Sequence, residues 1–408
     1  MPILSIFKST VLLLVLVFSS CKGQQKENEG PLANGLSDSI PEIIVAANRT
    51  ELYLPLLQGK MVGVVGNPTS VVFHEKGYTH LVDTLVALQV GVKKVFAPEH
   101  GFRGEADAGE HVMDSVDAQT GLPIVSLYGE NRKPAQKLLD GLDVMVFDIQ
   151  DVGVRFYTFI ATLQLVMEAC AEHNIPIIVL DRPNPNGHYV DGPTMMKEHS
   201  SFLGMTPIPL VYGMTIGEYA QLLNGEGWLE NGEKADLTVI PLKNYTHQSA
   251  YHLPIRPSPN LPSDAAITLY PSLGLFEGTN VNAGRGTEYQ FQRYGASFMD
   301  STKYDFSYVP HPNFGSKHPK EEGKTCYGKD LSQTPRMNEM TLQWVIDAYK
   351  NTLDKSKFFL TSGFTKHAGT PLLQQQIEAG LSEQEIKATW QDELENFKKI
   401  RQKYLIYD

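Results

Sequence analysis

Five short apolar runs, each followed by a polar loop, constrain the fold of this 408-residue chain more than any other feature. The runs cover residues 61–65, 92–97, 124–127, 144–149 and 177–180. Segments with helical spacing of apolar residues lie between them, as at 80–88 and 159–173. Strands that alternate with helices at this spacing predict βαβ units, and therefore an α/β fold with helices on both faces of a parallel sheet.

The loops that follow these runs are rich in glycine, proline and ionisable residues. Their sequences are GNPTS, PEHGFRGE, YGE, DIQDVGVR and DRPNPNG. Because the strands of a parallel sheet run the same way, all five loops emerge at one edge, which is where open α/β sheets bind ligands. We therefore expect a functional site at this edge.

The second of these loops, within residues 95–110, carries the densest group of ionisable side chains. Pro98 ends the strand, and Glu99, His100, Arg103 and Glu105 follow it closely. A carboxyl group in a partly apolar pocket is suited to donate a proton near neutral pH, and Glu99 is the first candidate. His100 is a candidate base, ligand-binding residue or metal ligand. The alternative is a solvated acidic loop held together by Arg103.

Two further loops at the same edge supply candidate binding residues. In FDIQDVGVRFYT, Asp148 and Asp151 bracket the strand end, Arg155 is suited to bidentate pairing with a carboxylate, and Tyr157 offers a flat apolar face. The alternative for this loop is an Asp–Arg pair that serves only as a scaffold.

In LDRPNPNG, Arg182 is expected to pair with Asp181, and Asn184 is suited to hydrogen-bond sugar hydroxyls. A rigid proline-fixed turn is the alternative.

A fourth polar loop lies in the second half of the chain. The sequence FEGTNVNAGRGTE contains Glu277, Asn280, Arg285 and Thr287, and the upstream SPNLPS adds Asn260. A carboxylate with arginine and asparagine on one loop makes a polar clamp, and sites commonly form where two domains meet.

The regular alternation of expected strands and helices ends after about residue 193. A helix at 216–223 and a strand at 237–240 precede a loop-rich stretch, 254–295, whose prolines exclude a central strand. Further helices are expected at 341–353, 371–379 and 383–394, with strands at 358–360 and 404–407. We therefore expect an α/β domain over 41–200 and a smaller, mixed α+β domain over 201–408.

The first forty residues predict export and lipid anchoring. Lys8 precedes an apolar run at 11–18, and Ser-Ser-Cys21 follows, which is typical of a bacterial signal peptide over 1–20 with lipidation at Cys21. Residues 21–40 are polar and predict a flexible tether. The protein is expected in the bacterial cell envelope, where the lipid would hold it at the membrane. An ordinary secretory signal is the alternative.

Composition and absent motifs exclude several classes of protein. The formal net charge of −11 disfavours a nucleic-acid partner. Beyond residue 21 only Cys170 and Cys326 remain, without a CxxC zinc motif. The chain also lacks GxGxxG, Walker, GxSxG and HExxH signatures. No cofactor and no metal ion are therefore expected.

Carboxylates on two facing loops are what glycoside hydrolysis needs, because one protonates the leaving oxygen and the other stabilises the positive centre, activates water or attacks. Two other interpretations stay open. One is a metal-dependent hydrolase that uses Asp148, Asp151 and His100; the other is a binding lipoprotein without catalysis.

Several long motifs together resemble those of a bacterial family, the exo-β-N-acetylmuramidases of the NamZ type. They are APEHGFRG, FDIQDVGVRFYT, LDRPNPNG, YGMTIGE, PSPNLP, EGTN and GRGTE, followed by FTKHAGT and RQKYLIY near the C-terminus. They occur in the family's order, and the resemblance extends from about residue 45 to the end.

The resemblance implies a Rossmann-like N-terminal domain without nucleotide and a smaller C-terminal domain. It also implies release of N-acetylmuramic acid from the non-reducing ends of peptidoglycan fragments. The family's glutamates fall on Glu99 and Glu277, and its GRGT arginine falls on Arg285. The lactyl carboxylate of that sugar would be bound by one of the loop arginines, which are Arg103, Arg155, Arg182 and Arg285. A muropeptide-binding lipoprotein that has lost catalysis is the alternative.

Overall fold

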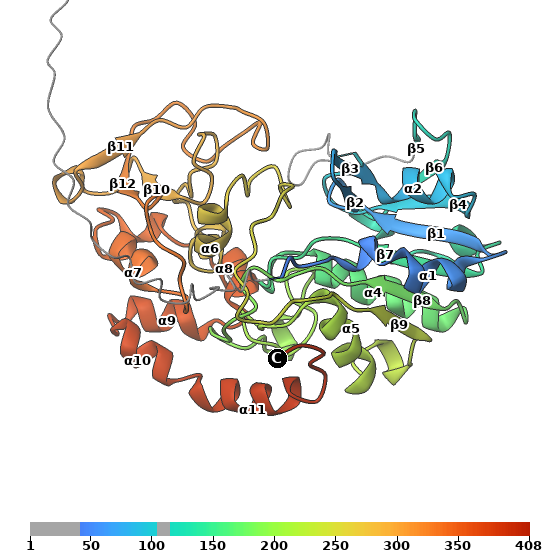
Figure 1. Ribbon diagram of the computed structural model, residues 1–408. Helices are drawn as coiled ribbons and strands as arrows, with labels where there is room; N and C mark the ends of the chain where they lie inside the picture. The colour runs from blue at the N-terminus through green and yellow to red at the C-terminus, as the bar shows by residue number, and fades with distance from the viewer. Residues whose placement is uncertain (1–40, 104–114) are drawn as a thin grey trace, which may run out of the picture. The chain divides into compact units, whose positions relative to one another are not determined.

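A seven-stranded sheet forms the centre of the N-terminal half of the protein (Figure 1). The computed structural model describes residues 41–103 and 115–408. In spatial order the strands are β5 (Ser115–Val116), β6 (Pro123–Ser126), β4 (Gly91–Ala97), β1 (Met61–Gly66), β7 (Val144–Asp148), β8 (Ile177–Leu180) and β9 (Leu237–Ile240). All neighbouring pairs are parallel except β5 with β6.

Helices cover both faces of this sheet, which confirms the expected α/β architecture. Val64 of β1 pairs with Val95 and Val146 and packs in a core with α1 (Thr50–Leu57) and α2 (Leu81–Ala87). Side chains of alternate residues point to opposite faces of a strand, so neighbouring Val65 joins a second core. That core contains side chains of α4 (Phe159–Glu172) and α5 (Ile216–Gly225). This half also contains the short helix α3 (Gln136–Leu139) and a small hairpin of β2 (Val71–His74) and β3 (Gly77–His80).

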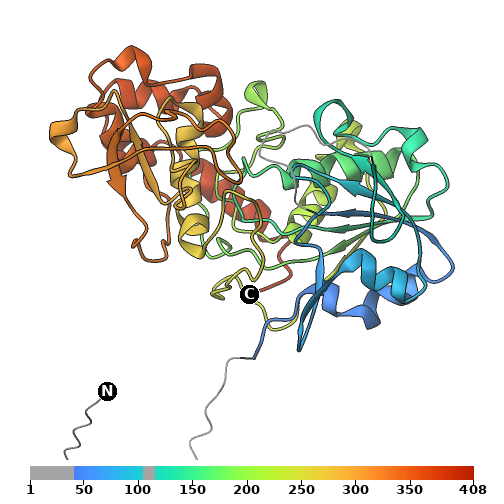
Figure 2. The same ribbon diagram turned by 90° about the horizontal axis from the view of Figure 1, so that it is seen from above.

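The C-terminal part contains a small antiparallel sheet surrounded by helices (Figures 1 and 2). The strand order is β10 (Arg293–Ala296), β12 (Cys326–Asp330) and β11 (Phe306–Tyr308). The helices are α6 (Asp264–Leu273), the 3₁₀ helix η5 (Gly274–Gly278), α7 (Gln343–Lys350), α8 (Thr361–Ala368), α9 (Leu372–Glu378), α10 (Glu383–Ala388) and α11 (Gln391–Arg401). This arrangement confirms the expected smaller α+β region. Among the described residues, Cys170 and Cys326 are both buried and form no disulfide bond.

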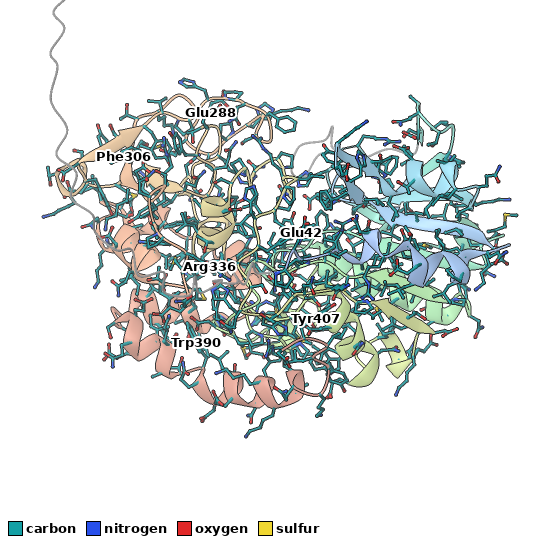
Figure 3. The ribbon with its side chains drawn as sticks, viewed as in Figure 1. Glu42, Glu288, Phe306, Arg336, Trp390 and Tyr407 are labelled. Atoms are coloured by element: carbon teal, nitrogen blue, oxygen red, sulfur yellow. The ribbon has the colours of Figure 1, made fainter. Side chains whose placement is uncertain are left out.

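The expected boundary after residue 200 cuts through the large sheet. Strand β9 was expected in the second domain, but it pairs with β8, with Val179 opposite Val239. Residues 42–408 form one compact unit by their internal contacts. The expected strand at 404–407 is also wrong, because this segment is an irregular tail. Tyr407 of this tail is labelled in Figure 3. The tail lies against the N-terminal half, where the Tyr407 hydroxyl donates to Asp181 over 2.7 Å.

Three other elements differ from the sequence-based expectation. Helix α6 lies inside the stretch 254–295 that was expected to be loop, and begins where the Ser263 hydroxyl accepts from the Ala266 amide. The strand expected at 358–360 is not formed; Phe359 makes one isolated bridge to Thr279. The single helix expected at 383–394 is two helices, α10 and α11. Within the described ranges, we find no helix with the length and apolar character needed to span a membrane.

Candidate active site

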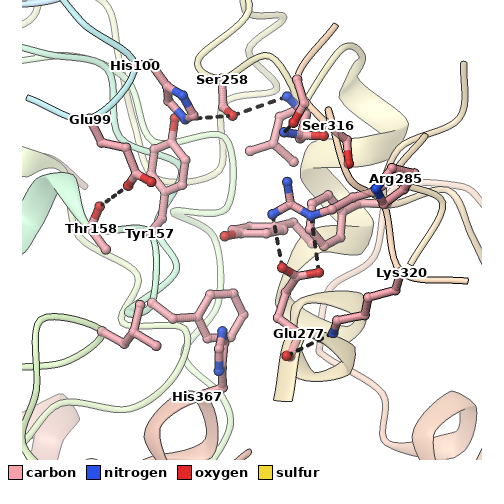
Figure 4. Close-up of a pocket in the computed structure, with 18 of the residues that line it drawn as sticks. Glu99, His100, Tyr157, Thr158, Ser258, Glu277, Arg285, Ser316, Lys320 and His367 are labelled. Carbon is pink, nitrogen blue, oxygen red and sulfur yellow. Dashed lines mark hydrogen bonds and ion pairs between the residues drawn. The ribbon is translucent and has the colours of Figure 1, made fainter. Parts of the chain in front are cut away.

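A pocket of about 630 Å³ collects candidate residues from both halves of the chain. Of the residues predicted from the sequence, six line it: Glu99, His100, Tyr157, Asn260, Glu277 and Arg285. Figure 4 shows Glu99 and Thr158 on one side of the pocket and the Glu277–Arg285 pair on the other. The expected convergence of loops from both halves is therefore present in the fold.

Glu99 lies just beyond the end of β4 and is partly exposed to the pocket. The Thr158 hydroxyl, at the N-terminal cap of α4, donates to its Oε2 over 3.1 Å. The next residue, His100, has a φ of 71°, in the left-handed region that non-glycine residues seldom adopt. Its Nε2 lies 3.3 Å from the Ser258 hydroxyl. The strand end, the α4 cap and this turn thus define the position of the Glu99 carboxyl group.

Glu277 lies in η5 and forms a two-point ion pair with Arg285. Nε of Arg285 lies 3.2 Å from Oε1, and Nη2 lies 3.1 Å from Oε2. The two side chains are 23% and 20% exposed, so both remain accessible from the pocket. Burial raises the pKa of Glu277, but the charges of Arg285 and Lys320 outweigh burial and lower it to about 2. Glu277 is therefore a carboxylate at neutral pH.

Lys320 is a pocket residue that the sequence did not reveal. Its ammonium group donates to the carbonyls of Phe276, Glu277 and Thr279, at 3.0, 3.0 and 2.6 Å. It therefore fixes the backbone that carries Glu277 and adds a positive charge beside the carboxylate. Lys320 lies in a stretch, residues 310–335, whose apolar residues show no helix or strand periodicity, so no sequence pattern placed it in a site.

Other pocket residues were also not predicted as site residues. Ser258 belongs to the SPNLPS motif and His367 to the FTKHAGT motif, so both lay in quoted motifs without an assigned role. Tyr270 comes from α6, a helix that was not expected from the sequence, and burial raises the pKa of its hydroxyl. The Nδ2 of Asn260 donates to the Gly315 carbonyl over 2.7 Å, whereas its Oδ1 is buried without a partner.

The two acidic residues at the end of β7 lie outside the pocket and hold the sheet edge together. Asp148 forms a fully buried pair with Arg182, with distances of 2.6 and 2.8 Å between the two charged groups. The partner expected for Arg182 was Asp181, which instead accepts from Thr215, Gly217 and Tyr407.

Asp151 accepts from the Gly153 amide over 2.6 Å and from the Tyr212 hydroxyl. Both oxygens of Asp148 are occupied by Arg182, and the described part of the chain has no group of three residues that could hold a metal ion. These contacts do not fit the metal-dependent hydrolase considered above.

Arg155 is fully buried and its guanidinium donates to four main-chain carbonyls instead of facing the pocket. These carbonyls belong to Pro193, Ile208, His367 and Ala368. Burial lowers the pKa of Arg155 to about 9. The residue connects the loop after β7 to the last turn of α8.

The other predicted binding residues have structural partners as well. Arg103 bridges Asp83 and Asp117, and the Asn184 amide donates to the Met214 carbonyl over 2.8 Å. Asn280 donates to the Lys357 carbonyl over 2.8 Å, and the Thr287 hydroxyl to the Gly284 carbonyl over 2.7 Å.

Of the four arginines considered for the lactyl carboxylate, only Arg285 lines the pocket. Cys21 and Glu105 lie outside the described residues.

The two glutamates of the pocket are therefore in unlike environments. Glu277 is held ionised by two cations, while Glu99 receives a neutral hydroxyl donor from Thr158. Carboxyl pairs whose surroundings differ in this way divide the acid and anion roles in glycoside hydrolysis.

Comparisons with known proteins agree with this arrangement. Two family models match, described as the N-terminal and C-terminal parts of exo-β-N-acetylmuramidase NamZ, over residues 62–265 and 268–407. The chain is 38% identical over 374 residues to the peptidoglycan β-N-acetylmuramidase NamZ of Bacillus subtilis, covering 87% of this chain and 89% of that protein.

Two crystal structures of DUF1343 family proteins from Bacteroides fragilis share the fold. One has a TM-score of 0.83 at 43% identity and the other a TM-score of 0.75 at 28% identity. Each match covers 90% of this chain and 99% of the other. Together with the pocket, these findings confirm the resemblance drawn from the motifs: the chain belongs to the NamZ family of exo-β-N-acetylmuramidases and is a glycoside hydrolase.

Proposed function

We propose that the protein releases N-acetylmuramic acid from the non-reducing end of peptidoglycan fragments by acid/base catalysis with carboxyl groups. The observation that carries the proposal is the presence of Glu99 and the ionised Glu277–Arg285 pair in one pocket. In this mechanism Glu99 protonates the leaving glycosidic oxygen. The Glu277 carboxylate stabilises positive charge that develops on the sugar.

The charges of the pocket also support a muramic sugar as substrate. N-acetylmuramic acid carries a lactyl carboxylate, and Arg285 and Lys320 make one side of the pocket positive. Arg285 has five N–H donors and uses two of them for Glu277, so others remain to bind a substrate carboxylate. We assign the lactyl group to this side of the pocket.

The test is product analysis on a synthetic disaccharide with N-acetylmuramic acid at its non-reducing end. Free N-acetylmuramic acid is expected, whereas the isomer with N-acetylglucosamine at that end should give no product. NMR of the first-formed anomer distinguishes retention from inversion. Binding without turnover would favour the muropeptide-binding alternative over hydrolysis.

The variant Glu99→Gln tests the assignment of the acid. Loss of general-acid catalysis should lower kcat/KM by about 10²–10⁴-fold. Glu75→Gln is the matched control, because Glu75 is exposed in the turn between β2 and β3. A Glu99→Gln enzyme with the kcat of the wild type would refute the role of Glu99 as proton donor.

We also propose that the enzyme is exported and anchored to the cell envelope by a lipid on Cys21. The charged start, the apolar run and Ser-Ser-Cys21 support this proposal. Cells that express the full chain should incorporate a labelled fatty acid into the protein and retain it in the membrane fraction. The Cys21→Ala variant should lose both properties; an unlabelled wild-type protein would exclude the anchor.

A further inference from the structure

His367 lines the pocket, but the mechanism above gives it no role. It lies in the last turn of α8, and its ring is partly exposed. Figure 4 shows it at the bottom of the view, between the side that carries Glu99 and the side that carries Glu277. A ring in this position is placed to contact the same sugar as the two glutamates.

The hydrogen bonds of the ring determine what its second nitrogen offers to a ligand. Nδ1 lies 2.8 Å from the Gly363 carbonyl, one turn earlier in α8. A carbonyl oxygen only accepts, so Nδ1 carries the proton. In a neutral ring the other nitrogen, Nε2, is then an acceptor.

The surroundings of His367 favour the neutral ring. Burial lowers its pKa below the ordinary value, and the nearby charges of Lys320 and Arg285 act in the same direction. The hydrogen bond to the Gly363 carbonyl and the charge of Glu277 act in the opposite direction but do not reverse the shift. Nε2 is thus a neutral hydrogen-bond acceptor in the pocket, unlike the carboxylate of Glu277.

The wall beside His367 is apolar. The ring of Phe156 lies 5.4 Å from the His367 ring, and Tyr270 packs edge-on against Phe156 at 5.1 Å. Leu203 also lines the pocket and is only partly buried. A single hydrogen-bond acceptor among apolar side chains is complementary to a ligand group that combines one N–H donor with a methyl group.

The backbone that carries His367 is firmly held. Arg155 donates to the carbonyls of His367 and Ala368, at 3.0 and 2.7 Å, and so caps the end of α8. Gly278, next to Glu277, packs directly on Phe364 of α8, where a Cβ would lie 2.3 Å from the Phe364 Cα. These contacts fix the position of the His367 ring relative to Glu277.

We propose that His367 determines specificity for the acetamido group of the substrate sugar. Nε2 accepts the amide N–H, while Phe156 and Leu203 contact the acetyl methyl. The protein would thus select N-acylated 2-amino sugars over sugars that lack this group. This inference rests on the proposed function, because it concerns the same pocket and the same sugar.

The experiment compares two muramoyl disaccharides, one with the acetamido group and one with hydrogen at C2 of the muramoyl residue. In His367→Phe, kcat/KM for the acetamido substrate should fall by about 10- to 100-fold, the effect of one lost hydrogen bond that leaves a polar group unpaired. Activity on the 2-deoxy substrate should change less than twofold. His367→Gln supplies a side-chain carbonyl and should recover part of the discrimination.

Controls separate a specific role from a structural one. Lys366→Ala, a change at an exposed neighbour in α8, should leave both activities unchanged. An equal fall on both substrates in His367→Phe would overturn the proposal. ¹⁵N NMR of labelled histidine should show the His367 Nε2 without a proton at neutral pH; a protonated Nε2 would also overturn it.

Failure of the proposed function can be recognised independently. If the wild-type enzyme turns over neither disaccharide, calorimetric binding of N-acetylmuramic acid and its 2-deoxy analogue replaces the rate measurement. A preference for the acetamido sugar that disappears in His367→Phe would then support the role of His367 without hydrolysis. Equal binding of both sugars by the wild-type protein would overturn it.

Discussion

At the scale of single residues, the charge state of Glu277 depends on its neighbours. Arg285 contacts both oxygens of the carboxylate, and Lys320 holds the adjacent backbone. Burial alone would raise the pKa of Glu277, so its low value near 2 depends on these cations. An anion in this position suits the role that we propose for Glu277, the stabilisation of positive charge during glycoside hydrolysis.

Removal of Arg285 should change the pH dependence of the enzyme. In Arg285→Met, burial is no longer outweighed by the ion pair, so the pKa of Glu277 rises. In the proposed mechanism the ionised form of Glu277 is the active one, so the acid limb of the kcat/KM profile should move to higher pH. The check is a pH–rate profile of wild type and variant, with Arg256→Met, an exposed arginine, as control. An unshifted acid limb would contradict the assigned role of Arg285.

At the scale of elements, the contact between η5 and α8 brings Glu277 and His367 into one pocket. Gly278 of η5 lies so close to α8 that a Cβ would approach the Phe364 Cα to 2.3 Å and its nitrogen to 2.6 Å. The Gly278 carbonyl also accepts from the Leu360 amide over 2.9 Å. The absence of a side chain at Gly278 is therefore a packing requirement.

Gly278→Ala should destabilise the fold, because the added methyl group meets main-chain atoms that cannot rotate away. We expect a loss of about 1–3 kcal/mol, the usual cost of overpacking a core. Gly363→Ala is the matched control in α8, since its Cβ would meet nothing closer than 3.6 Å. That change should be neutral or stabilise by up to about 1 kcal/mol through helix propensity. Urea unfolding measures the free energy of unfolding of both variants, and equal values for Gly278→Ala and Gly363→Ala would contradict the packing argument.

The pattern of apolar residues predicted elements well where local sequence sets the structure. The five expected parallel strands are present because their runs are buried on both faces of the sheet. Helix α6 was missed because the prolines before it and Pro271 within it obscured its helical pattern. The tail at 404–407 has strand-like residues, but its partners are side chains such as Asp181 instead of a neighbouring strand.

At the scale of the whole molecule, the C-terminal tail is attached to the sheet edge through buried acidic residues. Tyr407 and Thr215 both donate to Asp181 over 2.7 Å, and the Asp408 carbonyl accepts from the His247 amide over 2.8 Å. Burial raises the pKa of Asp181 to about 7, more than its hydrogen bonds lower it. The attachment of the tail is therefore sensitive to pH.

Asp181→Asn tests this sensitivity. The folded-state pKa of Asp181 lies above its unfolded value, so its contribution to stability is full below about pH 4 and is lost as pH rises through about 7. Relative to Asp181→Asn, the wild type should lose stability on the order of 4 kcal/mol over this interval. Denaturant unfolding of both proteins at several pH values measures the difference. A difference that stays constant with pH would show that Asp181 does not titrate in this range.

The parallel sheet, the family and the glycine-rich motifs that contain Glu99, Glu277 and Arg285 could all be predicted from the amino-acid sequence. These features depend on local spacing and on motifs that lie close together in the chain. Which polar residues face the pocket could be seen only in the folded structure. Asp148, Arg155 and Arg182 carry the same kinds of charge as Glu277 and Arg285, but their partners lie far away in sequence and hold them outside the pocket. Lys320 and His367 join it for the same reason, because the packing of distant segments brings them beside Glu277.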